Sequence, residues 1–227
     1  MGPVTGVGER LAPFLRALAA SPPELDDLAV SITRLLRPRV DPISVFADLD
    51  ELAAACPTPT RDGVMQHLFG SGLMVGDRSS YHSRHNSCID QVLARRTGMP
   101  ITLAVVGIEV ARRLGVRLAG VGMPGHFLIG DPDDPEWFAD PFHGRTALSR
   151  RDCRELSMTV GGTNWSDHFL TTIPPRLVAA RILNNLKFSC ERHGDEVGLA
   201  MVMQARSAMP ELGDNDDEAR LALSVLN

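Results

Sequence analysis

The stretch PITLAVVGIEVARRLG, residues 100–115, decides how this sequence folds. Pro100 suits the first turn of a helix, and Gly115 suits the position just after its end. The first half of the stretch is apolar nearly all round, which is typical of a helix buried on every side. Charged side chains follow at Glu109 and Arg112. We therefore predict a central helix over Ile101–Leu114 that is too short and too charged to span a membrane.

A small β-sheet is predicted directly after this helix. Val116–Met123 and His126–Gly130 are short runs of β-prone residues. The sequence DPDDP at 131–135 is rich in turn-forming residues, and Glu136–Asp140 then suits the returning strand. Loop is expected from there to a short helix that begins near Ser149. A central helix packed on a small antiparallel sheet gives an α+β fold class.

Helical segments are predicted on both sides of this core. Amphipathic spacing, prolines and caps place them at 9–20, 24–36, 41–56, 60–69, 88–96, 176–192, 196–208 and 217–226. We divide the chain into an N-terminal helical segment at 1–76, which belongs to the core domain, a core at 77–172 and a helical tail at 173–227. The tail is expected to form a helical hairpin.

Composition and local patterns exclude several classes of function. The net charge is −5, and no basic cluster of the kind that follows a phosphate backbone is present, so we expect no nucleic-acid partner. Residues 1–9 lack the pattern of a secretory signal, and no apolar run suggests a membrane partner. Cys56, Cys88, Cys153 and Cys190 lack CxxC spacing and are expected to be reduced thiols in the cytoplasm. Gly120-Val-Gly122 is too short a motif for a dinucleotide site, so we expect no cofactor.

The predicted hairpin brings a histidine close to an aspartate. If its turn is centred on Asp133, then His126 lies opposite Asp140, and Leu128 lies opposite Phe138. Directly opposed residues of antiparallel strands have Cβ atoms about 4.5–5.5 Å apart. Such a pair can be a general base held by its carboxylate, or a structural link between two strands. A shift by one residue would send the partners to opposite faces.

Cys88 is the candidate nucleophile by residue type. It falls in the first turn of the helix predicted at 88–96, where free N–H groups and the helix dipole favour a thiolate. Asp90 in the same turn opposes a thiolate, and a buried cysteine that only packs is the alternative. Zinc could accept His82, His85 and Cys88, but their spacing matches none of the usual sites, so we expect no metal.

The order of the motifs along the chain resembles a known family. NSCIDQVLARRTGMPI at 86–101 leads into IEVARRLG at 108–115, and PGHFL at 124–128 and DPF at 140–142 follow. Together they resemble the SirB-like family of bacterial proteins, within the transglutaminase-like superfamily. The resemblance covers about residues 28–156. It also includes LNNLK at 183–187, which resembles the start of a tetratricopeptide-like tail.

The resemblance implies a papain-like core in which a helix packs on an antiparallel sheet. In active transglutaminase-like enzymes a cysteine begins that helix, and a histidine and an aspartate come from neighbouring strands. His126 and Asp140 match the two strand positions. Alignment of Gly98-Met-Pro100 with the superfamily's Gly-x-Cys places Pro100 where the nucleophile belongs, and proline has no nucleophilic side chain.

Two functions follow from this mixture of matches. In the first, a Cys88 thiolate attacks an amide or ester, with His126 as acid and base and Asp140 orienting it, in a hydrolase or acyltransferase. In the second, the chain is catalytically inactive, the pocket only retains His126 and Asp140, and the helical tail binds a protein or peptide partner. The fold alone does not decide between them.

Overall fold

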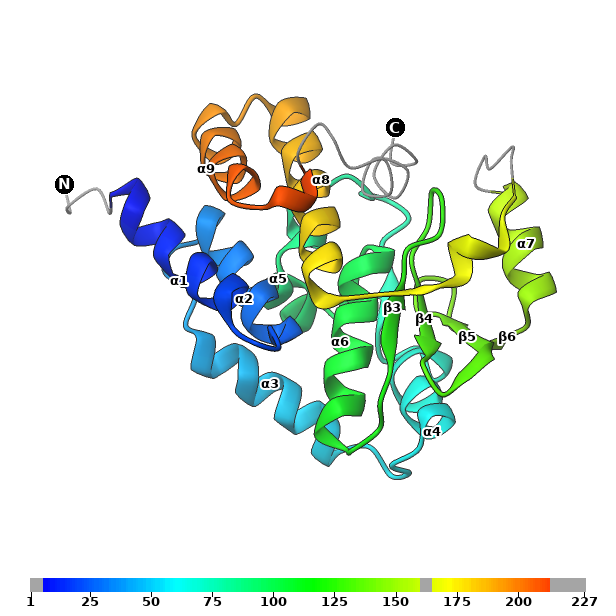
Figure 1. Cartoon of the computed structure of the whole chain (residues 1–227). Coiled ribbons are helices and arrows are strands. Elements are labelled where there is room, and N and C mark those ends of the chain that lie inside the picture. The colour runs from blue at the N-terminus through cyan, green and yellow to red at the C-terminus, as the bar shows by residue number, and fades with distance from the viewer. Residues whose placement is uncertain (1–5, 160–164, 213–227) are drawn as a thin grey trace.

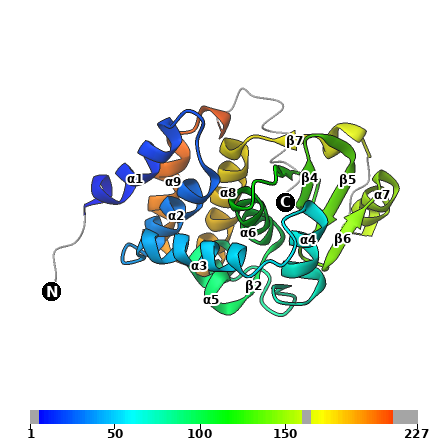
Figure 2. The ribbon, with the colours of Figure 1, turned by 90° about the horizontal axis from the view of Figure 1, so that it is seen from below.

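Helix α6 (Pro100–Arg113) lies at the centre of the molecule, between a group of helices and a β-sheet (Figure 1 and Figure 2). The computed structural model describes residues 6–159 and 165–212. Every residue of α6 from Pro100 to Ala111 is buried, as its apolar sequence indicates. The predicted helix packed on a small antiparallel sheet is confirmed, and the fold class is α+β.

The sheet contains five strands in the order β6-β5-β4-β3-β7, and every neighbouring pair is antiparallel. The strands are β3 (Ala119–Val121), β4 (Leu128–Asp131), β5 (Asp134–Asp140), β6 (Arg145–Leu148) and β7 (Thr172–Ile173). Side chains of one face, such as Ile129 and Ala139, belong to the main core that contains α6. Those of the other face, such as Leu128 and Phe138, form a second core with α7 (Arg150–Thr159). Both faces of the sheet are therefore covered.

The register of the hairpin between β4 and β5 differs from the predicted one. Ile129 pairs with Ala139, and Gly130 pairs with Phe138. The prediction that Leu128 faces Phe138 is therefore wrong by two residues. Because faces alternate with a period of two, a shift of two leaves each side chain on its predicted face.

The turn explains the difference in register. The ladder continues to an Asp131–Asp134 pair after an irregularity between Gly130 and Asp131, so the turn is shorter than the five residues predicted. His126 precedes β4 and is not directly opposite Asp140 in the ladder. The two residues instead meet diagonally, at a range that a long side chain can cover.

The predicted helices within the described residues are confirmed, with ends that differ by a few residues. They are α1 (Val7–Ala19), α2 (Leu25–Leu36), α3 (Pro42–Ala54), α4 (Arg61–Met65) with a π-helical turn at Gln66–Gly70, α5 (Ile89–Arg95), α7, α8 (Pro175–His193) and α9 (Glu196–Ser207). The sequence predicts a loop where strand β6 lies. A short parallel pair of β1 (Val75–Gly76) and β2 (Thr97–Gly98) was also not predicted. The tail helix predicted at 217–226 lies outside the described residues.

The tail helices pack against the N-terminal helices. Helix α8 contacts α2, and α9 contacts α1, as Figure 1 and Figure 2 both show. Buried side chains of α8 and α9, among them Leu183 and Val202, belong to the same core as α6. Polar contacts add to this packing: Ser189 Oγ donates to the His82 carbonyl at 3.0 Å, and Arg84 pairs with Asp195 at 3.0 Å. The C-terminal part of α8 and the residue before α9 are therefore joined to the segment that precedes α5.

No helix among the described residues is both long enough and apolar enough to cross a membrane. The central helix itself carries a buried charge, Glu109, which is 1% exposed. Its carboxylate accepts from Arg112 Nε at 2.8 Å and from Arg113 Nη1 at 2.9 Å, and both arginines also bind Asp26. Burial and the nearby charge of Asp26 raise the pKa of Glu109 to about 7.

This carboxyl group makes the stability of the protein depend on pH near neutrality. The pKa of Glu109 is raised above its ordinary value of 4.5, so the folded state holds the proton more tightly than the unfolded state. Its contribution to stability is therefore complete below about pH 4.5 and is lost as the pH rises through about 7. We expect Glu109→Gln to remove this decline, which urea unfolding at pH 5, 6, 7 and 8 would measure. An equal decline in the variant would contradict the assignment to Glu109.

Candidate active site

His126 is held by a tight turn between β3 and β4. Pro124 and Gly125 occupy the two central positions, and Gly125 has φ +67°, a conformation that favours glycine. The N–H of His126 donates to the Met123 carbonyl at 3.2 Å, which closes the turn. A proline followed by a glycine with positive φ is the signature of a type II turn. His126 itself is only 5% exposed.

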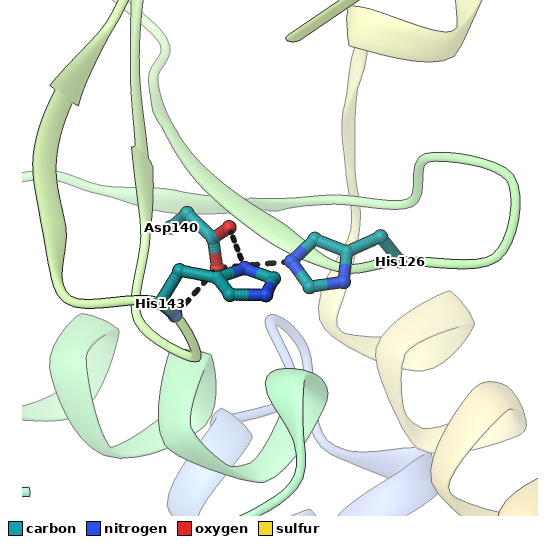
Figure 3. A group of neighbouring side chains, drawn as sticks. All are labelled: His126, Asp140 and His143. Atoms are coloured by element: carbon teal, nitrogen blue, oxygen red, sulfur yellow. Dashed lines mark hydrogen bonds and ion pairs between the residues drawn. The ribbon is translucent and has the colours of Figure 1, made fainter. Parts of the chain in front are cut away.

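Asp140, the last residue of β5, is fully buried and is the centre of a hydrogen-bond network (Figure 3). Its Oδ1 accepts from His126 Nε2 at 2.9 Å and from the backbone N–H groups of Phe142 and His143. Its Oδ2 accepts from His143 Nδ1 at 2.6 Å. Burial alone would raise the pKa of Asp140, but the hydrogen bonds and charges of the two histidines outweigh it and lower the pKa. The carboxylate is therefore ionised and fully satisfied.

The ionised carboxylate fixes the protonation of His126. A carboxylate only accepts hydrogen bonds, so Nε2 of His126 must carry the proton. When the ring is neutral, its lone pair therefore lies on Nδ1, which points away from Asp140 (Figure 3). This is the arrangement of a general base whose second nitrogen is held by an acid residue. The side chains of His126 and Asp140, which were predicted to meet, are thus in contact.

His143 is a member of this group that the sequence did not reveal. Its ring stacks on that of His126 with centroids 5.3 Å apart and an interplanar angle of 29°. Its side chain is 31% exposed, whereas that of His126 is 4% exposed, so His143 covers the pair on its outer side. A local signal did exist, because an aspartate whose side chain accepts N–H groups two and three residues later forms a recognisable turn.

Aromatic rings surround the rest of the pair. Phe142 contacts the His126 ring edge-on with centroids 6.1 Å apart, and Tyr81 contacts Phe142 at 5.6 Å. Burial raises the pKa of Tyr81, so its hydroxyl is protonated at neutral pH. These rings give the pair apolar surroundings, in which hydrogen bonds are electrostatically stronger than in water.

His126, Asp140 and His143 are also able to hold a metal ion. Their ligand atoms all lie within 4.8 Å of one another, and imidazole and carboxylate are common ligands. As the side chains stand, however, each imidazole donates an N–H hydrogen bond to the carboxylate, and a metal between them would have to replace both of these protons. Within residues 6–159 and 165–212 no other three histidine, cysteine or acidic residues form such a group, so His82, His85 and Cys88 do not.

Cys88 lies in different surroundings from those predicted for a nucleophile. It precedes α5 as its N-cap residue, and its side chain is 0% exposed within the hydrophobic core. Burial and the charge of Asp90 raise its pKa to about 12. The other groups whose charges act on it are Arg37, Arg84 and Cys190, none of which belongs to the His126 group. Such a thiol is protonated at neutral pH, so the structure gives no support to Cys88 as the partner of His126.

Comparison with known proteins identifies the family to which the chain belongs. The model of the transglutaminase-like superfamily matches residues 22–184. A UPF0162 protein of Xylella fastidiosa (strain Temecula1) is 39% identical over 167 residues, which are 71% of this chain and 56% of that protein. A UPF0162 protein of Pseudomonas aeruginosa is 30% identical over 220 residues, 92% of this chain and 80% of its own length.

A shorter match lies in a eukaryotic protein. Human F-box only protein 21 is 44% identical over 68 residues, which are 30% of this chain and 11% of that protein. No solved structure matches. This chain spans little more than half the length of the Xylella relative, at 56%. The family match covers both the His126 turn and the Asp140 strand, and it shows that the chain belongs to the SirB-like family of the transglutaminase-like superfamily.

Proposed function

We propose that this protein hydrolyses an amide or ester bond, with His126 as its acid and base and water as the nucleophile. The observation that carries the proposal is the hydrogen bond from His126 Nε2 to the fully buried Asp140 carboxylate. Burying a carboxylate is costly unless hydrogen bonds compensate it. The chain supplies four such bonds here, and the result is one fixed orientation of the imidazole.

The proposed reaction needs no thiol from the chain. His126 Nδ1 takes a proton from water while the water oxygen forms a bond to the carbonyl carbon. The protonated ring then gives that proton to the leaving nitrogen or oxygen as its bond to carbon breaks. Asp140 stabilises the positively charged ring between the two steps. Pro100 at the superfamily's nucleophile position and the pKa of about 12 for Cys88 both favour water over a thiol.

A non-catalytic function is the second candidate. Low exposure of His126, at 5%, and the absence of a side-chain nucleophile at Pro100 favour a pocket that binds a protein or peptide partner without reaction. The tetratricopeptide-like resemblance of the tail is the basis for proposing a partner there.

The four free cysteines favour a reducing compartment, so we propose that the protein is located in the cytoplasm.

Replacement of His126 separates these functions. With p-nitrophenyl acetate as the probe ester, we expect His126→Gln to lower kcat/KM at least about a hundredfold, because general acid and base catalysis contributes at least that much. The matched control is His168→Gln, since His168 is exposed and lies outside the site. Equal rates for His126→Gln and the control would leave the non-catalytic function. Loss of activity in a folded Cys88→Ser variant would favour the thiol instead.

A further inference from the structure

Arg181 of helix α8 contacts both ends of the turn that carries His126. Its Nη2 donates to the Met123 carbonyl at 3.3 Å and to the His126 carbonyl at 3.2 Å. The Met123 carbonyl also accepts the N–H of His126. One guanidinium nitrogen therefore bridges the first and last residues of a turn whose conformation depends on Pro124 and Gly125.

The surroundings of Arg181 are unusual for a charged side chain. It is 2% exposed, and none of the ion pairs among the described residues includes it. Its Nε and Nη1 are buried without a hydrogen-bond partner. The guanidinium lies over the Phe127 ring at 5.2 Å, and burial lowers its pKa to about 10, so it stays charged at neutral pH. An apolar side chain would avoid this desolvation cost.

Gly122 provides the space for the guanidinium. A Cβ atom at this position would lie 2.6 Å from Arg181 Nη1, closer than atoms of this kind approach. A side chain at position 122, just after β3, would therefore move the guanidinium from its present place. Arg181 is a buried cation with few partners. Its desolvation free energy is high for a side chain that only fills space, but its Nη2 binds two carbonyls of one turn. The specific effect of these two hydrogen bonds is to fix the position of the His126 backbone.

We infer that Arg181 is a positioning residue of His126, through which the tail helix α8 sets the orientation of the imidazole toward Asp140. The catalytic consequence rests on the proposed function, while the orientation itself does not. The tail is then part of the site as well as the element proposed to bind a partner. A movement of α8 would change the turn directly, because no other residue stands between Arg181 and the two carbonyls.

Arg181→Met tests this inference. The methionine fills similar space but cannot donate to the carbonyls, so the turn loses its bridge. In ¹⁵N NMR of the imidazoles, we expect wild-type His126 to show one tautomer, protonated on Nε2, and the variant to show exchange between the two tautomers. With an active enzyme, kcat for p-nitrophenyl acetate should fall about tenfold to a hundredfold with little change in KM, as small misplacements of a catalytic group do.

Two further variants make the result decisive. Arg206→Met is the matched control, because Arg206 also has buried, unpaired Nε and Nη1 atoms but lies on α9 rather than on the helix that binds the turn. It should leave the His126 signals unchanged. Gly122→Ala displaces the guanidinium without removing it and should reproduce the Arg181→Met spectrum, which decides the question if Arg181→Met does not fold.

The outcomes distinguish the inference from the function it extends. Exchange of the His126 tautomers in Arg181→Met or Gly122→Ala, but not in Arg206→Met, supports the positioning role. A single unchanged tautomer in a folded Arg181→Met variant overturns it, whatever the activity. A wild-type protein without hydrolytic activity would contradict the proposed function alone, because the tautomer measurement does not depend on turnover.

Discussion

Replacing Pro100 by cysteine is expected to create a thiol that alkylates about ten to a hundred times faster than Cys88. Pro100 is the first residue of α6, and thiols at helix N-termini have pKa values of about 3.5–7.5. Cys88 has a pKa of about 12, so its thiolate fraction at pH 7.5 is smaller by about four orders of magnitude. Part of this advantage is lost because nucleophilicity falls with pKa. Up to about two orders of magnitude remain, and because Pro100 is buried as well, burial slows the reaction of both thiols.

The measurement is the rate of carbamidomethylation by iodoacetamide, with the labelled peptide identified by mass spectrometry. A Cys56→Ser background removes the half-buried thiol of Cys56. Adding His126→Gln to Pro100→Cys should slow the labelling, because the histidine would no longer accept the proton of the thiol. If the new thiol reacts no faster than Cys88, or if removal of His126 has no effect, then position 100 is not the nucleophile position of this site.

Local patterns in the sequence were enough to predict the elements of the fold. Three local signals predict the bounds of α6 and α8 to within a few residues. They are the apolar stretch from Ile101, the prolines at helix starts and the glycines at helix ends. Register is harder, because it depends on the length of one turn. The error of two residues between β4 and β5 left His126 and Asp140 on the same face, so the predicted contact was correct although the ladder was not.

The burial and the partners of individual side chains in the site depend on tertiary packing, which local sequence patterns do not reveal. Cys88 has the sequence context of an activated thiol, yet the Ile89 N–H that follows it donates to Thr33 of α2, and the packing of α2 and α5 buries the sulfur. Arg181 is 55 residues from His126 in sequence, and only the packing of α8 on the core brings them together. His143 was accessible in principle through the turn chemistry after Asp140, and it was missed.

Asp140→Asn is expected to lower the free energy of unfolding by about 3–5 kcal/mol, the usual cost of breaking a buried charged network. Four donors converge on the carboxylate, and two of them are the ring nitrogens of His126 and His143. An asparagine keeps one accepting oxygen and places an N–H₂ group against a donor, so at least one buried hydrogen bond is lost and one donor is left unpaired. Urea unfolding at pH 7 measures the difference.

The pH dependence identifies the carboxylate as the cause. The pKa of Asp140 is below its ordinary value of 3.8, so its stabilising effect is present above that value and is lost as the pH falls through the pKa of the folded state. The difference in stability between wild type and Asp140→Asn should therefore be largest near neutrality and shrink below about pH 3.8. Asp134 also has a lowered pKa but lies at the surface beside Arg61, where solvent screens the ion pair, so Asp134→Asn should cost far less. A loss of that small size for Asp140→Asn would mean that the histidines hold their positions without the carboxylate, and the orienting role on which the proposed chemistry depends would be wrong.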